Sequence, residues 1–125
     1  MEIRSVGIVG AGQMGNGIAH VMALAGYDVL LNDLDRETLD AALSRIERNM
    51  ARQVKSGRID TAEKDAALAR IAPVLELTEL GQTDLIIEAA TEREEIKQKI
   101  FDALLPHLKP DTILTSNTSS ISITR

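Results

Sequence analysis

The apolar positions near the N-terminus change from a continuous run to a helical spacing within a few residues. Residues 3–9 are largely apolar, which is typical of a parallel strand covered on both faces. From about residue 13 to 25, apolar residues recur three and four positions apart, which predicts a helix that ends before Gly26. Another apolar run predicts a second strand at 27–32.

A long stretch without strand signals follows the second predicted strand. One apolar stripe at helical spacing predicts a long amphipathic helix that ends at Gly57. Asp60 and Glu63 have the spacing of a capping box and predict a second helix, which we expect Pro73 to stop. Because a crossover needs only about a dozen residues, we expect an inserted helical hairpin at about residues 36–72.

Strands and a helix alternate again in the last part of the chain. Apolar patterning predicts a short third strand at 73–77 and a fourth at 84–90. Thr91 and Glu94 have capping-box spacing for the helix that follows, and a fifth strand is expected at 112–115. Strands that alternate with helices predict an α/β fold, a doubly wound parallel sheet of the Rossmann type.

A glycine-rich turn joins the first predicted strand to the first predicted helix, with the spacing Gly-x-Gly-x-x-Gly. In this context the first glycine permits a tight turn and the second lets the backbone approach a pyrophosphate. The third lets the helix pack against the strand. The helix start offers free N–H groups and a positive dipole end to an anion. The candidate cofactor-binding residues here are Gly10, Gly12, Gln13, Met14 and Gly15.

An acidic residue at the end of the second predicted strand indicates which dinucleotide fits. Asp33 follows Gly15 by 18 residues, close to the ~20 expected of the carboxylate that accepts hydrogen bonds from the ribose. A carboxylate here repels a 2′-phosphate, so it favours NAD over NADP. Asp35 can begin the next helix, which leaves Asp33 available, although the nearby Arg36 offers a positive charge to a phosphate.

Composition narrows the expected partners of this 125-residue chain, which we place in one domain at residues 1–125. Its formal net charge of −5 argues against nucleic acid or an anionic membrane as the main partner. No apolar run approaches the ~18 residues of a membrane span, and the N-terminus shows no signal-peptide pattern. Without cysteine there is no disulfide or thiolate metal site. We expect a cytoplasmic, metal-free protein.

Three segments are distinctive in combination with the predicted hairpin: Gly-Ala-Gly-Gln-Met-Gly-Asn-Gly-Ile-Ala at 10–19, Ile-Ile-Glu-Ala-Ala-Thr-Glu at 86–92, and Ser-Asn-Thr-Ser-Ser at 116–120. Together they resemble the 3-hydroxyacyl-CoA dehydrogenase family, including bacterial 3-hydroxybutyryl-CoA dehydrogenases, over the whole chain. That family moves a hydride between NAD and the third carbon of an acyl-CoA. The resemblance therefore implies NAD as cofactor and an acyl-CoA substrate, in fatty-acid or butanoate metabolism.

The resemblance also implies roles for individual residues. Asp33 would hold the adenine ribose, while Glu92 and Lys97 would line the cofactor site. Asn117 would lie near the nicotinamide. Ser119 would hydrogen-bond the substrate oxygen, where hydride transfer builds or removes charge.

Basic side chains at the far end of the predicted hairpin have two interpretations. Arg48, Arg52, Lys55 and Arg58 form either a solvated face or an arm that reaches a phosphorylated substrate. The resemblance places Asn49 and Lys55 near the position where the family contacts coenzyme A.

The family's general base is a histidine oriented by a glutamate, in a Gly-x-His-Phe-Phe motif that would follow residue 125. The resemblance likewise places the sixth strand and an all-helical dimerisation domain beyond the chain. We therefore expect these residues to bind NAD without oxidising 3-hydroxybutyryl-CoA, and exposed apolar surface to favour a homo-oligomer. Two alternatives stay open. One is another NAD(P)-dependent dehydrogenase, of the 3-hydroxyisobutyrate or 6-phosphogluconate type; the other is a non-catalytic nucleotide-sensing module.

Overall fold

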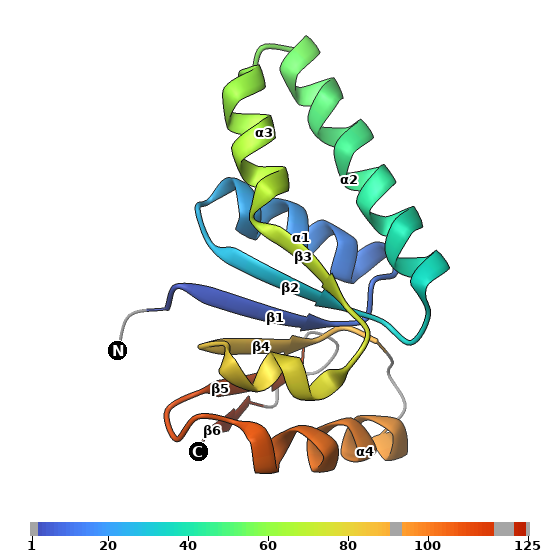
Figure 1. The fold of residues 1–125 in the computed structure, drawn as a ribbon, viewed down its shortest axis with the longest axis vertical. Helices are drawn as coiled ribbons and strands as arrows, with labels where there is room; N and C mark the ends of the chain where they lie inside the picture. The colour runs from blue at the N-terminus through green and yellow to red at the C-terminus, as the bar shows by residue number, and fades with distance from the viewer. Residues whose placement is uncertain (1–2, 91–93, 117–121, 125) are drawn as a thin grey trace.

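The structure is a computed structural model that describes residues 3–90, 94–116 and 122–124 (Figure 1). Its strands are β1 Ser5–Val9, β2 Asp28–Asn32, β3 Ile71–Val74, β4 Leu85–Glu88, β5 Ile113–Ser116 and β6 Ser122–Thr124. They form one sheet in the order β3-β2-β1-β4-β5-β6, in which the first five strands are parallel and β6 is antiparallel to β5. The predicted doubly wound sheet is thus confirmed.

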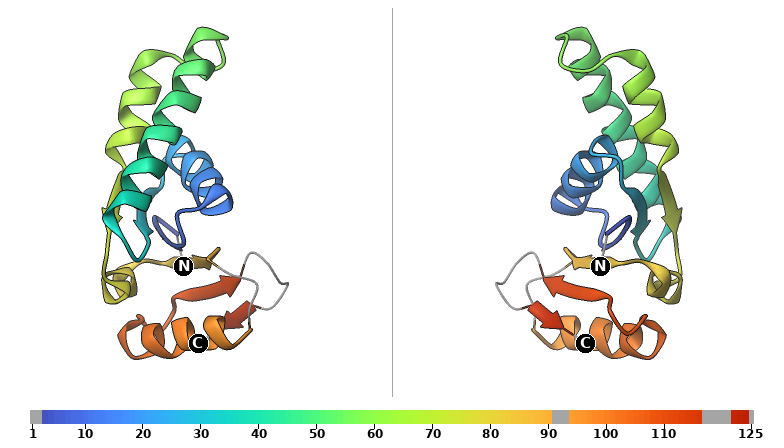
Figure 2. Two further views of the ribbon diagram at one scale, coloured as in Figure 1. Left: turned by 90° about the vertical axis from the view of Figure 1, so that its right-hand side faces the viewer. Right: turned by 90° about the vertical axis from the view of Figure 1, so that its left-hand side faces the viewer.

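Helices cover both faces of this sheet (Figure 2). They are α1 Gln13–Leu24, α2 Arg36–Lys55, α3 Thr61–Ala69 and α4 Glu94–Leu104, with 3-10 helices η1 Leu77–Gln82 and η2 Leu105–His107. The first three pack on one face, and η1 with α4 packs on the other. The hairpin of α2 and α3 extends well beyond the edge of the sheet (Figure 1).

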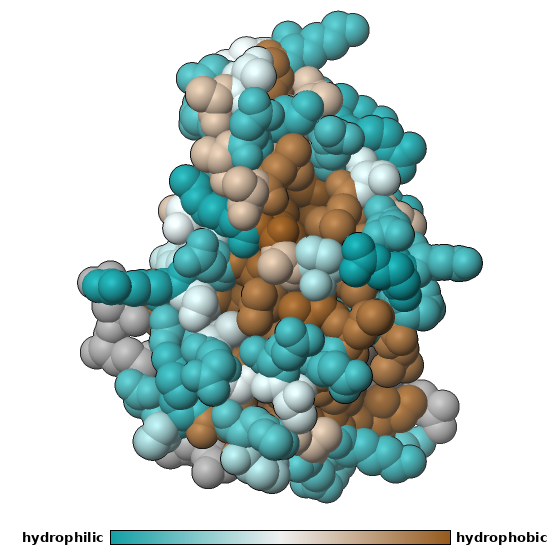
Figure 3. All heavy atoms as spheres, viewed as in Figure 1, coloured by the Kyte–Doolittle hydropathy of each residue, from teal (hydrophilic) through white to brown (hydrophobic). Residues whose placement is uncertain are grey.

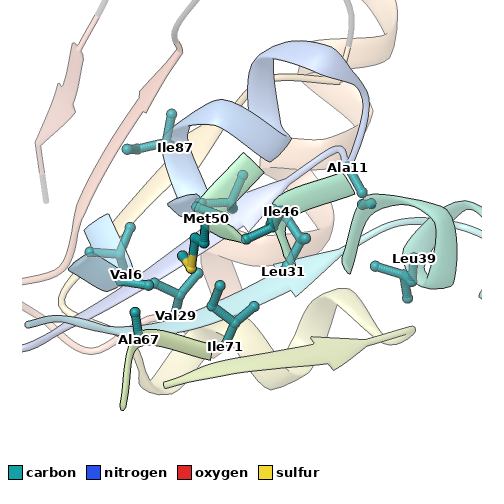
Figure 4. Close-up of a cluster of buried hydrophobic side chains, with 14 residues drawn as sticks. Val6, Ala11, Val29, Leu31, Leu39, Ile46, Met50, Ala67, Ile71 and Ile87 are labelled. Carbon is teal, nitrogen blue, oxygen red and sulfur yellow. The ribbon is translucent and has the colours of Figure 1, made fainter. Parts of the chain in front are cut away.

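Each face of the sheet has its own apolar cluster, because successive side chains of a strand point to opposite faces. Ile87 of β4 joins the larger cluster, while its neighbour Ile86 joins the smaller one. In the larger cluster, Ile46 and Met50 of α2 are fully buried against β1 and β2 (Figure 4). The smaller cluster packs Phe101 of α4 against β4 and β5. The middle of each central strand is therefore apolar on both faces, because both faces of the sheet are covered.

The two helices of the hairpin begin where the sequence indicates. The Asp35 carboxylate accepts a hydrogen bond from the Thr38 N–H at 2.7 Å and caps α2. Asp60 and Glu63 form the predicted capping box at the start of α3. Between the two helices, Gly57 has a φ of +80°, a conformation that favours glycine.

The third strand lies two residues earlier than its pattern predicted. It spans Ile71–Val74 rather than 73–77, so Pro73 lies inside a strand and does not stop the preceding helix, which ends at Ala69. β3 is the edge strand and pairs only with β2. An edge strand tolerates proline because one side of its backbone needs no partner. Residues 77–82, part of the region expected to be strand and turn, form η1 instead.

A sixth strand is present, contrary to the expectation that none would fall within the chain. β6 pairs with β5 in the antiparallel sense, with Leu114 opposite Ile123. Only five residues separate Ser116 from Ser122, and a parallel strand would need a crossover of a dozen or more. The short connection therefore fixes the antiparallel direction.

The surface carries several large apolar side chains. Leu34 is 90% exposed and Val21 is 65% exposed. On the face seen in Figure 3, apolar atoms extend from the groove between α2 and α3 towards α4. Within the described ranges, no helix has the length and apolar character needed to cross a bilayer.

Candidate functional site

A cavity of about 580 Å³ opens where the carboxyl ends of β1, β2 and β4 meet. The chain leaves β1 and β4 in opposite directions across the sheet, and such a switch point is where doubly wound sheets bind ligands. The cavity is lined by Val9, Gly10, Gly12, Asn32, Asp33, Leu34, Thr38, Leu77, Ala89, Ala90, Ile96, Lys99 and Ile100.

The glycine turn between β1 and α1 has no room for side chains at two of its positions. Gly10 has a φ of +103°, and a Cβ there would lie 2.7 Å from the Ala90 Cα. A Cβ on Gly15 would lie 1.7 Å from the carbonyl oxygen of Gly10. The Gly10 N–H donates to the Asn32 carbonyl at 2.8 Å and ties the turn to the end of β2. Sterics therefore require glycine at both positions.

The other candidate residues at the start of α1 do not all line the cavity. Gly12 is the N-cap residue, lines the cavity and has open space where a Cβ would stand. No side chain caps the helix at this end, so the N–H groups of its first turn have no side-chain acceptor there and are available to an anion. Gln13 and Met14 line a different groove, of about 460 Å³, which α1 forms with Ile87 of β4.

Asp33 lies on the cavity wall at the end of β2. Its Oδ2 accepts a hydrogen bond from the Ala11 N–H at 2.8 Å, and its Oδ1 accepts one from the Leu34 N–H at 2.6 Å. These bonds orient the carboxylate beside the glycine turn. Each oxygen has a second lone pair, so the carboxylate can still accept hydrogen bonds from two ribose hydroxyls.

The two other charged residues of this loop are engaged elsewhere. Asp35 caps α2, which lowers the pKa of its carboxyl through the Thr38 hydrogen bonds. The Arg36 guanidinium forms an ion pair with Asp40 at 3.3 Å on the exposed side of α2. Neither residue lines the cavity. Of these three charged residues, Asp33 alone contributes its charge to the cavity wall at the end of β2.

The opposite wall of the cavity is mostly apolar. Leu77 of η1 and Ile96 and Ile100 of α4 form it, and Leu34 stands at its rim. A flat aromatic base can be buried between such side chains. Lys99, which sequence reasoning missed, also lines the cavity. Its position three residues after Ile96 on one helix face was the only available signal.

Lys97 lies behind this wall rather than on it. Its Nζ donates to the Ser116 Oγ at 2.8 Å and lies 3.7 Å from the Glu88 Oε1. The Ser116 Oγ in turn donates to Glu88 Oε1 at 3.0 Å. All three residues are buried at the carboxyl ends of β4 and β5. Glu88 and Ser116 were not among the predicted site residues, although the distinctive segments 86–92 and 116–120 contain them and each is a polar residue at the end of an apolar strand.

The remaining candidates divide into two groups. Glu92, Asn117 and Ser119 lie outside the described residues. Asn49 and Lys55 lie on the second half of α2, which is part of the hairpin and does not line the cavity. The Asn49 side-chain oxygen accepts a hydrogen bond from Arg52 at 3.1 Å.

The two histidines of the chain both lie away from the cavity. His20 contacts Gln53 at 2.7 Å and links α1 to α2. His107 lies in η2, where its carbonyl oxygen meets Gly81 of η1. Neither imidazole lines the cavity where it could act as a general base.

Comparison with known proteins finds a matching family model and similar proteins. The family model for the NAD-binding domain of 3-hydroxyacyl-CoA dehydrogenase matches residues 5–125. A 3-hydroxybutyryl-CoA dehydrogenase of Bradyrhizobium diazoefficiens is 52% identical over 123 residues, which are 98% of this chain and 42% of that protein. A protein of the same name from Mycobacterium tuberculosis is 41% identical over 122 residues, 97% of this chain and 43% of the relative.

Solved structures of proteins with the same name are similar to this chain in fold and sequence. A crystal structure of 3-hydroxybutyryl-CoA dehydrogenase from Escherichia coli superposes with a TM-score of 0.93 at 40% identity, over 98% of this chain and 26% of that one. An (S)-3-hydroxybutyryl-CoA dehydrogenase from Ralstonia eutropha gives 0.91 at 40% identity, over 98% and 43%. The chain thus spans less than half the length of these relatives.

Proposed function

The chain belongs to the 3-hydroxyacyl-CoA dehydrogenase family, as its NAD-binding domain, and we propose that it binds NAD for the oxidation of (S)-3-hydroxyacyl-CoA to 3-ketoacyl-CoA. 3-Hydroxybutyryl-CoA is the proposed substrate, in fatty-acid or butanoate metabolism, because two relatives carry that name. Family membership argues against the 3-hydroxyisobutyrate and 6-phosphogluconate alternatives. The observation that carries the proposal is a cavity with the glycine turn and Asp33 on its wall.

In this proposal the dinucleotide lies across the carboxyl ends of the strands. Its pyrophosphate sits over Gly10, Gly12 and Gly15 at the uncapped start of α1, where backbone N–H groups stabilise negative charge. Asp33 holds the adenine ribose, and Leu34 contacts the adenine. Gln13, Met14, Glu92, Lys97 and Asn117 complete the proposed cofactor site from the resemblance.

The proposed contacts with the substrate rest on the family resemblance. Ser119 would donate a hydrogen bond to the substrate oxygen, and Asn49 and Lys55 of the hairpin would contact coenzyme A. We further propose that residues 1–125 act as one domain, in a cytoplasmic homo-oligomer. Sedimentation of the purified chain tests the oligomer, since a monomer across the micromolar range would contradict it.

The proposed pyrophosphate site is tested by replacing Gly12. In Gly12→Ala the added methyl group meets nothing within 4 Å, so the chain should fold, but the methyl group enters the space that the phosphates would occupy. We expect NAD affinity to fall by roughly tenfold or more in isothermal titration calorimetry.

Gly17→Ala is the matched control, because a Cβ at position 17 also meets nothing within 4 Å. Gly17 lines the second groove, with Gln13 and Met14, and not the cavity beside the glycine turn. It should keep wild-type affinity and gain slightly in helix stability. Equal NAD affinity in Gly12→Ala and Gly17→Ala would refute the pyrophosphate site.

A further inference from the structure

Three buried polar residues at the carboxyl ends of β4 and β5 form what we call the edge cluster: Glu88, Lys97 and Ser116. Glu88 is the last residue of β4 and pairs in register with Ser116, the last residue of β5. Lys97 reaches them from the first turns of α4. Glu88 and Ser116 have no task in the function proposed above.

The edge cluster is costly to bury, so its retention in a small domain needs a reason. Glu88 is fully buried and Lys97 is 4% exposed. Removing a carboxylate and an ammonium from water carries a large penalty, which an apolar replacement of similar volume would avoid. The penalty is offset here by hydrogen bonds. Glu88 accepts from the Ala90 N–H at 2.6 Å and from the Ser116 hydroxyl at 3.0 Å, and Lys97 donates to the Ser116 Oγ at 2.8 Å.

The contacts of the edge cluster lead to the walls of the cavity. The second carboxylate oxygen of Glu88, Oε2, accepts a hydrogen bond from the Ala90 N–H at 2.6 Å. Ala90 lines the cavity, and its Cα is the atom that a side chain on Gly10 would strike. The Ala89 N–H donates to the Val9 carbonyl at 2.8 Å. One carboxylate thus fixes the turn after β4 against the glycine turn.

The other end of the edge cluster fixes where β5 stops. Ser116 is held through its Oγ by Glu88 and Lys97 at once, and it directly precedes the segment 117–120. In the proposed function, the adenosine half of the dinucleotide lies at Asp33 over β2, and its phosphates lie over β1. Its second half then extends over β4 and β5. The edge cluster therefore lies beneath the nicotinamide half.

We propose that Glu88 is a positioning residue, which holds Lys97, Ser116 and the Ala90 N–H so that the β4 and β5 ends are shaped for the nicotinamide half of the dinucleotide. This inference rests on the proposed function. It predicts a selective defect: loss of the edge cluster weakens binding of NAD, which spans both halves, and leaves binding of AMP, which spans only the adenosine half.

The test compares NAD and AMP as ligands of the 125-residue chain by isothermal titration calorimetry. Glu88→Gln removes the negative charge that faces the Lys97 ammonium, and we expect NAD affinity to fall roughly tenfold. AMP affinity should change less than twofold. Adding Lys97→Met to Glu88→Gln removes the buried ammonium as well and should restore thermal stability but not NAD affinity.

A second pair of variants keeps the test decisive if Glu88→Gln does not fold. Ser116→Ala removes the hydroxyl that bridges Glu88 and Lys97, and Ser116→Thr restores it. The matched control is Thr112→Val, immediately before the start of β5, where the Thr112 hydroxyl donates to the Thr83 carbonyl at 2.9 Å. Ser116→Ala should lose NAD affinity selectively, while Ser116→Thr and Thr112→Val should keep it.

The outcomes are distinguishable. Equal losses of NAD and AMP affinity in Ser116→Ala would mean that the edge cluster only stabilises the fold, and would overturn the inference. Unchanged NAD affinity in both Ser116→Ala and a folded Glu88→Gln would overturn it as well. A wild-type chain that binds neither ligand would contradict the proposed function itself.

Discussion

Two carboxylates separated by one residue perform different tasks in the loop after β2. Asp35 caps α2 through the Thr38 N–H, whereas Asp33 turns its oxygens towards the Ala11 and Leu34 N–H groups on the cavity wall. Because the helix start has its own acceptor, Asp33 is not needed there. Its carboxylate is therefore available to the ribose hydroxyls of a dinucleotide.

Asp33→Ala should affect the proposed ribose contact and not the cap of α2, which Asp35 provides. It removes the acceptor for the ribose and the negative charge that repels a 2′-phosphate, so we expect NAD affinity to fall roughly tenfold and the preference for NAD over NADP to shrink. Titration of both cofactors measures the change.

Asp35→Ala is the matched control for Asp33→Ala. It should lower thermal stability, since α2 loses its cap, while both cofactor affinities stay as in the wild type. If Asp33→Ala bound NAD as tightly as the wild type, the assignment of the ribose to this residue would be wrong.

A third carboxylate, Asp84 at the amino ends of β1 and β4, supports stability rather than binding. The Lys109 ammonium and the Arg4 N–H lower the pKa of Asp84 from 3.8 to about 2. The group is more acidic in the folded chain, so its contribution is complete above pH 4 and is lost as the pH falls towards 2.

Asp84→Asn should therefore lower the free energy of unfolding at pH 7 by about 1 kcal/mol, a value reduced by the partial exposure of Lys109. Urea unfolding followed by circular dichroism at several pH values measures this difference. The gap between variant and wild type should narrow below pH 4 and close near pH 2. A gap that stays constant over that range would exclude the ion pair as its cause.

At the scale of elements, the hairpin is anchored to the sheet by one face of α2. Ile46 is fully buried in the larger apolar cluster, beside Met50 and against β1 and β2 (Figure 4). Ile46→Ala should cost about 2–5 kcal/mol of unfolding free energy, because it removes buried contacts and leaves a cavity. Chemical denaturation measures the loss.

Glu47→Ala, the adjacent but exposed position on the same helix, is the control for Ile46→Ala. It should change the unfolding free energy by no more than about 0.5 kcal/mol. Comparable losses in the two variants would mean that the hairpin is not anchored by this face.

Elements with strong local signals were predictable from the sequence. The capping residues Asp35, Asp60 and Glu63 fix where the hairpin helices begin, and these signals act within one turn of the chain. The buried strands β1, β2, β4 and β5 were found for a similar reason. Each is an apolar run too short for a helix and bounded by turn residues.

Elements that depend on distant partners were not predictable in the same way. Pro73 signals the end of a helix unless its strand is known to lie at the edge of the sheet, which only pairing with β2 reveals. β6 exists because β5 offers it an edge. At the site, Glu88 and Ser116 are 28 residues apart. Their contact follows from the pairing of β4 with β5 and from no local pattern.

At the scale of the whole molecule, the cavity can hold a cofactor but has no histidine on its wall. Neither His20 nor His107 lines it, so the 125 residues lack a positioned imidazole for the hydroxyl proton. We expect the chain to bind NAD without producing reduced nicotinamide from 3-hydroxybutyryl-CoA, as followed by absorbance. Steady turnover by the pure chain would overturn this expectation.

The central position of β1 has a consequence for how the chain acquires its shape. On one side β1 pairs with β2, about 23 residues away, and on the other with β4, about 79 residues away. During synthesis on the ribosome, β1, β2, the hairpin and β3 emerge first and can assemble. The side of β1 that pairs with β4 is then still unpaired. Until β4 emerges, that edge is an open template with which the strand of another chain can pair.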